Sequence, residues 1–296
     1  MYQVNKISYP ELQNYINVLE ILKTTDFSNF TDEAIYNKYF DHALALPRLG
    51  GNIAFPKSLN QKFYRVRLST NIGSKDNLFS TKTFSYPPPK FCNKKGRANL
   101  VNKPVFYCTD QAFPAIRECN AQIGIDGYLS IWKVNPEMKI HYATCLSEKL
   151  PDSNQWKEYG TYHHDFLISH QQVNDLSLVE YKVALRNFIT DRFMKEHYPY
   201  HISSLIAHEY LYYSNVEVLL YPSAQTFQNY TNFAFHPRSV DQYLHCEKVL
   251  HFKIVKEIDN QFELNINLIG IVDNHIIKWR KPSDMELEEL GFKKLN

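Results

Sequence analysis

The chain has 296 residues, of which 44% are hydrophobic and 22% are charged, a balance typical of soluble globular proteins. Its 33 basic and 31 acidic residues leave a net charge of +2, so neither nucleic acid nor an anionic membrane is an expected partner. The five cysteines form no CxxC pair and no apolar run approaches the roughly 18 residues of a membrane span, which predicts reduced thiols in a cytoplasmic protein.

The first fifty residues show the pattern of two helices. Residues 8–11 (Ser-Tyr-Pro-Glu) fit a capping box, and apolar side chains then recur at helical spacing over residues 12–22. A second helix is expected over residues 31–42, beginning at a Thr-Asp-Glu sequence. We therefore predict a helical extension over residues 1–60, with a boundary at the Gly-Gly-Asn sequence of residues 50–52.

The central part of the chain mixes strand and helix patterns too irregularly for a doubly wound parallel sheet. This mixture predicts an α+β fold, or mixed α/β. The predicted strands are residues 63–68, 104–109, 128–134, 139–142 and 216–221, and the predicted helices are residues 114–123, 176–196 and 202–213. The segment between residues 69 and 95 is expected to be a loop, in which Pro87–Pro89 either stiffens the chain or serves as a polyproline ligand for another protein.

The C-terminal part changes to a different pattern. Three predicted strands, at residues 249–258, 262–271 and 275–279, are separated by Asp-Asn sequences that favour turns. This pattern predicts an antiparallel meander, which closes the sheet or forms a C-terminal extension.

Several well-known sites are excluded by their missing motifs. The chain has neither GxxxxGK[ST] nor GxGxxG, so a P-loop enzyme or a Rossmann dehydrogenase is not expected. His197 and His201 have the spacing of a helical metal site, but Pro199 between them disfavours a regular helix. We therefore expect no bound metal.

A cation, an aromatic ring and an acid fall close together between residues 96 and 118. A Gly-Arg-Ala-Asn turn beginning at Gly96 leads into an apolar strand that contains Tyr107, and Glu118 follows on a helix. A guanidinium matches phosphate oxygens and an aromatic ring can stack on a planar ligand. The unit is thus a candidate half-site for an anionic, planar-ring ligand. Considered alone, however, Glu118 would be interpreted as a solvated helix residue.

Three elements in sequence order resemble the RES domain family. They are Tyr64-Arg65 on an early strand, the unit between residues 96 and 118, and the late Tyr-Pro-Ser sequence that ends at Ser223. The family takes its name from an Arg, a Glu and a Ser in this order. The residues that match the family are Arg65, Gly96, Arg97, Asn99, Tyr107, Glu118, Ser223 and Asn232.

The resemblance covers roughly residues 61–240, which would form the catalytic domain, and residues 241–296 would be a β-rich extension packed on it. It implies a core like that of ADP-ribosyltransferases, with a split, mainly antiparallel sheet and surrounding helices. The chain departs from the family in several places: residues 69–91 form a long insert, the segment from residue 142 to residue 177 is also long, both termini extend beyond a minimal domain, and Tyr230 stands where members often have Gly.

The implied activity is attack on NAD at the nicotinamide–ribose bond, with water, inorganic phosphate or a protein side chain as acceptor. Many family members are toxins paired with an antitoxin. The resemblance therefore implies an NAD glycohydrolase or phosphorylase that acts as a toxin or defence effector. Two alternatives stay open, namely a protein ADP-ribosyltransferase and a non-catalytic interaction module.

The resemblance also implies roles for individual residues. Glu118 is expected beside the reacting ribose, where a carboxylate stabilises positive charge. Arg65 and Arg97 are expected to bind the pyrophosphate, and Tyr107 or Tyr64 to form a wall for the nicotinamide ring.

The remaining residues of the implied site are polar. Ser223 is expected to take part in catalysis through a hydrogen bond to the ribose or a phosphate, and not as a covalent nucleophile, because no base is identifiable beside it. Asn99 and Asn232 complete the cofactor-binding set, and Asn232 is expected to support the loop of Ser223. On its own sequence context, Arg65 could instead pair with a surface acid, since Arg67 is an equally basic neighbour.

Overall fold

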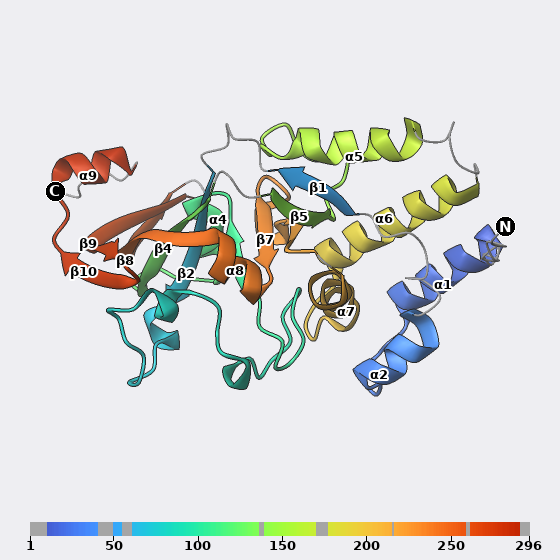
Figure 1. Ribbon diagram of the computed structural model, residues 1–296, viewed down its shortest axis with the longest axis horizontal. Coiled ribbons are helices and arrows are strands. Elements are labelled where there is room, and N and C mark those ends of the chain that lie inside the picture. The colour runs from blue at the N-terminus through green and yellow to red at the C-terminus, as the bar shows by residue number, and fades with distance from the viewer. Residues whose placement is uncertain are drawn as a thin grey trace, which may run out of the picture.

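The computed structural model describes residues 11–40, 50–54, 61–135, 139–169, 177–214, 216–258 and 261–290 (Figure 1). Ten strands in these ranges form one sheet, in the order β1-β5-β6-β7-β3-β2-β4-β8-β9-β10. Neighbouring strands are antiparallel throughout, except that β5 and β6 run parallel. The strands are β1 Gly50–Ala54, β2 Lys62–Leu68, β3 Phe106–Thr109, β4 Asp126–Val134, β5 Lys139–Thr144, β6 Val218–Pro222, β7 Thr231–Phe235, β8 Leu244–Ile258, β9 Gln261–Asp273 and β10 Ile276–Arg280.

The helices gather mainly around the half of the sheet that contains β5, β6 and β7 (Figure 1). The N-terminal helix α1 lies next to the long helix α6, α2 lies beyond α1, and α9 lies at the opposite end beside β9 and β10. The α-helices are α1 Leu12–Thr24, α2 Asp32–Ile35, α4 Ala112–Glu118, α5 Lys157–Ser169, α6 Ser177–Lys195, α7 His201–His208, α8 Pro237–Tyr243 and α9 Asp284–Glu289. Shorter turns of π-helix follow two of them, Tyr36–Phe40 after α2 and Glu209–Tyr213 after α7.

The prediction of a mixed, mainly antiparallel fold is confirmed, and residues 50–52, where a boundary was predicted, belong to a strand. Those residues open β1, which pairs with β5 at the edge of the sheet, so the N-terminal region is not purely helical. The sequence pattern missed β1 because two glycines begin it, and glycine is depleted in strands. Residues 8–10 of the predicted capping box, His42 and the turn at residues 259–260 lie outside the described residues.

Three apolar clusters hold these elements together. The first joins α1, α6 and α7 to one face of β6 and β7, with Leu19, Phe193 and Leu219 at its centre. The second covers the other face of the same strands and includes Trp156. The third packs α4 and α9 on β2, β4, β8 and β9, with Ile116 buried in it. On one face the cover therefore changes at β3, from the first cluster to the third, whereas the second cluster continues over the other face on both sides of β3.

The sheet is almost divided between β2 and β3. These two strands share a single paired position, Tyr64 with Thr109, whereas β2 pairs with β4 over its whole length, from Lys62 to Leu68. The third cluster lies on the β2 side of this split, and the first lies on the β3 side. The split leaves a gap between the two halves of the sheet, and strand edges at such a gap expose backbone groups that can face a ligand.

The C-terminal meander continues the main sheet, because β8 pairs with β4 along nearly all of β4. A turn at Asn274 and His275, both with positive φ, joins β9 to β10, as expected for a tight hairpin. This hairpin also holds the insert: the Trp279 Nε1 donates to the Leu78 carbonyl (3.0 Å), and the Ile277 amide donates to the Phe79 carbonyl (2.8 Å). Among the described helices, none has the length and apolar character needed to cross a membrane.

Asp110 is a buried carboxylate just after β3. Burial raises its pKa to about 6 from an ordinary value of 3.8, and the hydrogen bond from Gln155 Nε2 (3.0 Å) opposes part of that rise. Because the folded pKa lies above the unfolded one, the folded state binds this proton more tightly. The contribution of Asp110 to stability is therefore lost as the pH rises through the window between about 4 and about 6.

Replacing this group tests the sign of that dependence. We expect Asp110→Asn to be more stable than the wild type near neutral pH, by about 1–3 kcal/mol, and to lose most of this advantage at about pH 4.5. Urea unfolding at both pH values measures the difference. Asp165→Asn, which removes an exposed carboxylate from α5, controls for the lost charge. An Asp110→Asn advantage that stays constant with pH would contradict the assignment.

Candidate functional site

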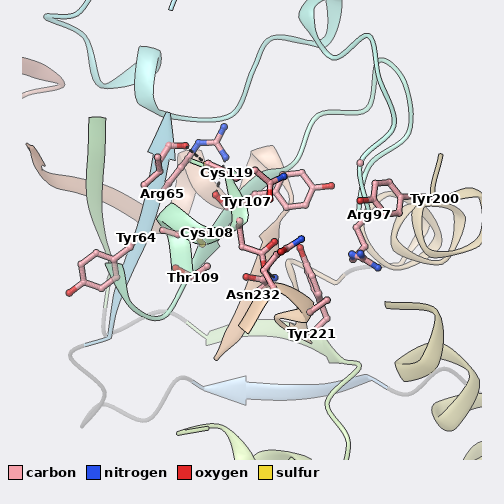
Figure 2. A pocket seen from close by; sticks show the side chains of 17 residues that line it. Tyr64, Arg65, Arg97, Tyr107, Cys108, Thr109, Cys119, Tyr200, Tyr221 and Asn232 are labelled. Carbon is pink, nitrogen blue, oxygen red and sulfur yellow. Dashed lines mark hydrogen bonds between the residues drawn. The ribbon is translucent and has the colours of Figure 1, made fainter. Parts of the chain in front are cut away.

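A cavity of about 380 Å³ lies at the split between β2 and β3. Its wall combines backbone and side chains from both strands with the end of α4, the turn at Gly96 and the segments around Tyr200 and Ala224. Figure 2 shows Arg65 at one side of the cavity and Arg97 with Tyr200 at the other, with Asn232 and Tyr221 below. Residues from seven separate parts of the chain thus converge on one space.

Glu118 is the last residue of α4, and its carboxylate is held by two donors. Its Oε1 accepts hydrogen bonds from the Ser223 hydroxyl (2.6 Å) and from Asn232 Nδ2 (2.8 Å). Ser223 follows β6 and Asn232 lies on β7, so these bonds tie the end of the helix to the sheet. Among the described residues, no group donates to Oε2, and Glu118 is an exposed residue in the cavity wall. The carboxylate is therefore oriented and still has an oxygen for a ligand.

The three residues predicted to be catalytic do not occupy equivalent places. Glu118 and Arg65 both line the cavity, whereas Ser223 is fully buried behind Glu118. Ser223 therefore positions the carboxylate, and its hydroxyl is already donated to it. Asn232 is also buried, but it lines the cavity, and its Oδ1 is a buried acceptor without a hydrogen-bond partner. A ligand hydroxyl or amide could donate to that oxygen, since buried polar atoms are normally paired.

Arg65 crosses the split in the sheet. Its Nη1 donates to the backbone carbonyl of Tyr107 on β3 (2.9 Å), and its guanidinium lies over the Phe106 ring at 5.3 Å. Its Nε is buried and without a partner among the described residues. Burial lowers the pKa of Arg65 from its ordinary value, yet arginine stays charged at neutral pH. The cavity therefore contains a fixed cation with unused hydrogen-bonding capacity.

The thiols beside Arg65 are not candidates for nucleophiles. Cys119 lines the cavity next to Glu118, and burial raises the pKa of its thiol to about 11. Cys108 is likewise buried, and burial raises its pKa well above the ordinary value. Both thiols are protonated at neutral pH, and a thiol is a weak nucleophile compared with the thiolate.

Tyr107 is locked in place by the turn at residues 96–99. Its hydroxyl donates to Asn99 Oδ1 (2.9 Å) and accepts from the Ala98 amide (2.8 Å). Asn99 Nδ2 in turn donates to the Lys94 and Leu100 carbonyls, so Asn99 lies behind Tyr107 and supports it. Asn99 therefore fixes an aromatic wall and is not itself among the residues that line the cavity; its part in cofactor binding stays a prediction.

Arg97 has a structural contact as well as a place in the cavity wall. Its Nη1 donates to the carbonyl of Phe193 (2.7 Å) near the C-terminal end of α6, where cations are favoured by the helix dipole. Its guanidinium also lies over the ring of Tyr200, at 4.8 Å from the ring centroid. Part of its charge is thereby engaged by the protein, just as the charge of Arg65 is engaged by the Tyr107 carbonyl and the Phe106 ring.

The aromatic walls differ in part from the prediction. Tyr64 contributes to the cavity wall, but Figure 2 shows its ring pointing away from the other labelled side chains. Tyr107, Tyr200 and Tyr221 provide the rings instead. No sequence pattern indicated Tyr200, which has a left-handed conformation (φ 54°) just before α7 and lines the cavity from the connection between α6 and α7.

No metal-binding group of three or more His, Cys, Asp or Glu side chains exists in the part of the chain described by the structure. No protein-family model matches the chain, and no curated protein matches it either. A functional proposal therefore depends on the geometry of the cavity and on the motifs that build it.

The Gly96 position explains why the turn needs glycine. A Cβ at this position would lie 2.4 Å from Asn99 Oδ1 and 2.7 Å from the Tyr107 hydroxyl, the two atoms that hydrogen-bond to each other. Both atoms belong to ordered, packed groups, so Gly96→Ala must separate them. We expect a loss of about 1–3 kcal/mol of unfolding free energy, measured by urea denaturation.

A matched control for this substitution is Gly73→Ala. A Cβ there would meet only Asp76 Oδ2, at 3.8 Å, which is an ordinary contact. Gly73→Ala should therefore leave stability within about 0.5 kcal/mol of the wild type. Equal stability of the two variants would show that the packing around Tyr107 does not require the absence of a Cβ at position 96.

Proposed function

We propose that the protein is an NAD-consuming enzyme that cleaves the nicotinamide–ribose bond, as a glycohydrolase or phosphorylase. The observation that carries this proposal is the Glu118 carboxylate, which Ser223 and Asn232 orient at the cavity while leaving Oε2 available. An Arg, a Glu and a Ser from distant parts of the sequence meet at one site, and this is the combination that characterises the RES domain. In the same proposal, the split between β2 and β3 corresponds to the cleft of an ADP-ribosyltransferase-like core.

The residues of the cavity fit the parts of NAD that take part in the reaction. Tyr107 offers an aromatic face for the nicotinamide ring, and the unpartnered Oδ1 of Asn232 can accept from a ribose hydroxyl or the carboxamide. Arg65 offers a guanidinium to the pyrophosphate, whose oxygens match it in bidentate fashion. The fit involves one cation, one acid and one ring, in separate places around the cavity.

The chemistry follows from the charge that develops when the bond breaks. Nicotinamide leaves with the electron pair of the bond and becomes neutral, while positive charge develops at the ribose C1″ and its ring oxygen. Glu118 is placed to stabilise that charge or to hold a ribose hydroxyl by accepting its proton in a hydrogen bond. Water then adds to C1″ and loses a proton to give ADP-ribose, or phosphate adds to give ADP-ribose-1″-phosphate.

The biological consequence of this activity would be depletion of NAD, and the proposal therefore includes a role as a toxin or defence effector. A cell that makes such an enzyme needs a means to restrain it, so an antitoxin protein that covers the cavity belongs to the same proposal. A protein side chain in place of water would make the enzyme a protein ADP-ribosyltransferase. The product decides between these acceptors.

The first test is incubation of the purified protein with NAD, with and without inorganic phosphate, followed by mass spectrometry of the products. We expect release of nicotinamide together with ADP-ribose or its 1″-phosphate. A protein-bound adduct would select the transferase, and no turnover with intact folding would select a non-catalytic module.

Glu118→Gln keeps the shape of the side chain and removes its charge. We expect kcat to fall at least tenfold, which corresponds to about 1.4 kcal/mol of barrier. Glu289→Gln, on the exposed side of α9, is the matched control because it removes a carboxylate outside the cavity wall. An unchanged rate in Glu118→Gln would remove this residue from the mechanism.

Ser223→Ala tests the positioning role separately. The variant removes one of the two donors to Oε1 while Asn232 keeps the other. We expect a reduced kcat with little change in KM, because the hydroxyl orients Glu118 and does not itself line the cavity. A rise in KM with constant kcat would instead indicate that Ser223 contacts the substrate.

A further inference from the structure

A second cavity, of about 870 Å³, adjoins the first at Arg65 and Val66, which line both. Its other walls come from the insert that follows β2, between Asn71 and Phe91. We call it the insert cavity. The insert is thus not only a connection between β2 and the turn at Gly96, since it encloses a space next to the proposed site.

The insert cavity is built on a framework of hydrogen bonds. Arg67 donates from Nη1 to the Thr83 carbonyl and from Nη2 to the Asn71 carbonyl and the Asp76 carboxylate, each at 2.7 Å. The hydroxyl of Tyr86 donates to Asp241 Oδ2, also at 2.7 Å. The cavity is therefore preformed, and Arg67 has a structural role in it.

The lining carries an excess of positive charge. Its one acid, Asp76, is paired with Arg67. Lys75 and Lys82 are exposed, and their ammonium groups have no acidic or hydrogen-bond partner among the described residues. Arg65 stands where the two cavities meet. Tyr86 and Phe91 supply aromatic surface in the same lining. Unpaired cations beside aromatic rings suit a ligand that has both phosphate and a planar base.

The size of the first cavity indicates why a second is needed. Ligand cavities of about 300–1,000 Å³ hold drug-sized molecules, and 380 Å³ lies near the lower end of that range. A dinucleotide is larger than such a molecule, so its second half must extend beyond the cavity. Arg97 lines only the first cavity and is engaged by α6 and Tyr200, whereas Arg65 lines both cavities, so a ligand bound at Arg65 can continue into the insert cavity.

We propose that the insert cavity binds the adenylate half of the dinucleotide, with the phosphates at Arg65 and with Lys75 and Lys82 along their path. This inference rests on the proposed cleavage of NAD, and it assigns a binding role to the part of the chain that departs most from the RES pattern. Recognition of the adenylate half then sets KM, whereas the chemistry at Glu118 sets kcat.

The test compares NAD with nicotinamide mononucleotide, which has the same scissile bond and lacks the adenylate half. We expect the wild type to prefer NAD by at least tenfold in kcat/KM, and the double variant Lys75→Ala/Lys82→Ala to reduce this preference about tenfold, mainly through the KM for NAD. Calorimetric titration with AMP should show a matching loss of affinity in the double variant. The melting temperature of the variant establishes that it is folded.

The control is Lys253→Ala/Lys256→Ala, which removes the same charge from exposed positions on β8 outside both cavities. It should leave the preference for NAD unchanged, so that a general charge effect is separated from a local one. If NAD is cleaved but the Lys75/Lys82 variant keeps the full preference and AMP affinity, the inference fails and the proposed function stands. If neither substrate is cleaved under any condition, the proposed function fails, and the assignment of the insert cavity to the adenylate half fails with it.

Discussion

The missing ladder between β2 and β3 is the constraint on which the rest of the site depends. A complete antiparallel pair would satisfy the backbone groups of both strands and leave no space between them. Here only Tyr64 and Thr109 are paired, and Arg65 reaches across to the Tyr107 carbonyl in place of a strand partner. The same guanidinium thus hydrogen-bonds to a backbone carbonyl of β3 and brings a positive charge to the cavity.

Two kinds of residue surround this cavity, and they have different physical tasks. Asn99 and Ser223 lie behind the wall and fix the groups in front of them, Tyr107 and Glu118. The fixing residues use their hydrogen-bonding capacity within the protein, so they have little left for a ligand. A motif that is read only as a set of ligand contacts would miss this division, because both kinds of residue are equally necessary for the geometry.

The sequence predicted the elements with strong periodicity and the order of the motif residues, and local chemistry explains both. The strands predicted at residues 63–68 and 128–134 are present as β2 and β4. The predictions missed β7, where Asn232 lies; the burial of Asn232 comes from the pairing of β7 with β3 and β6 on its two sides. Tyr200 and the split itself also arise from contacts between distant segments, which no local pattern encodes.

The hydrogen bonds between the β9–β10 hairpin and the insert bear on where the domain ends. The residues of the first cavity all lie between Tyr64 and Asn232, so a domain defined by the cavity alone would end near residue 240. The folded domain extends further. In it, β8 continues the sheet beside β4, and Trp279 and Ile277 hold the insert through the Leu78 and Phe79 carbonyls. The insert and the C-terminal hairpin are therefore one structural module made of two chain segments, and a change in the length of either would have to be matched in the other.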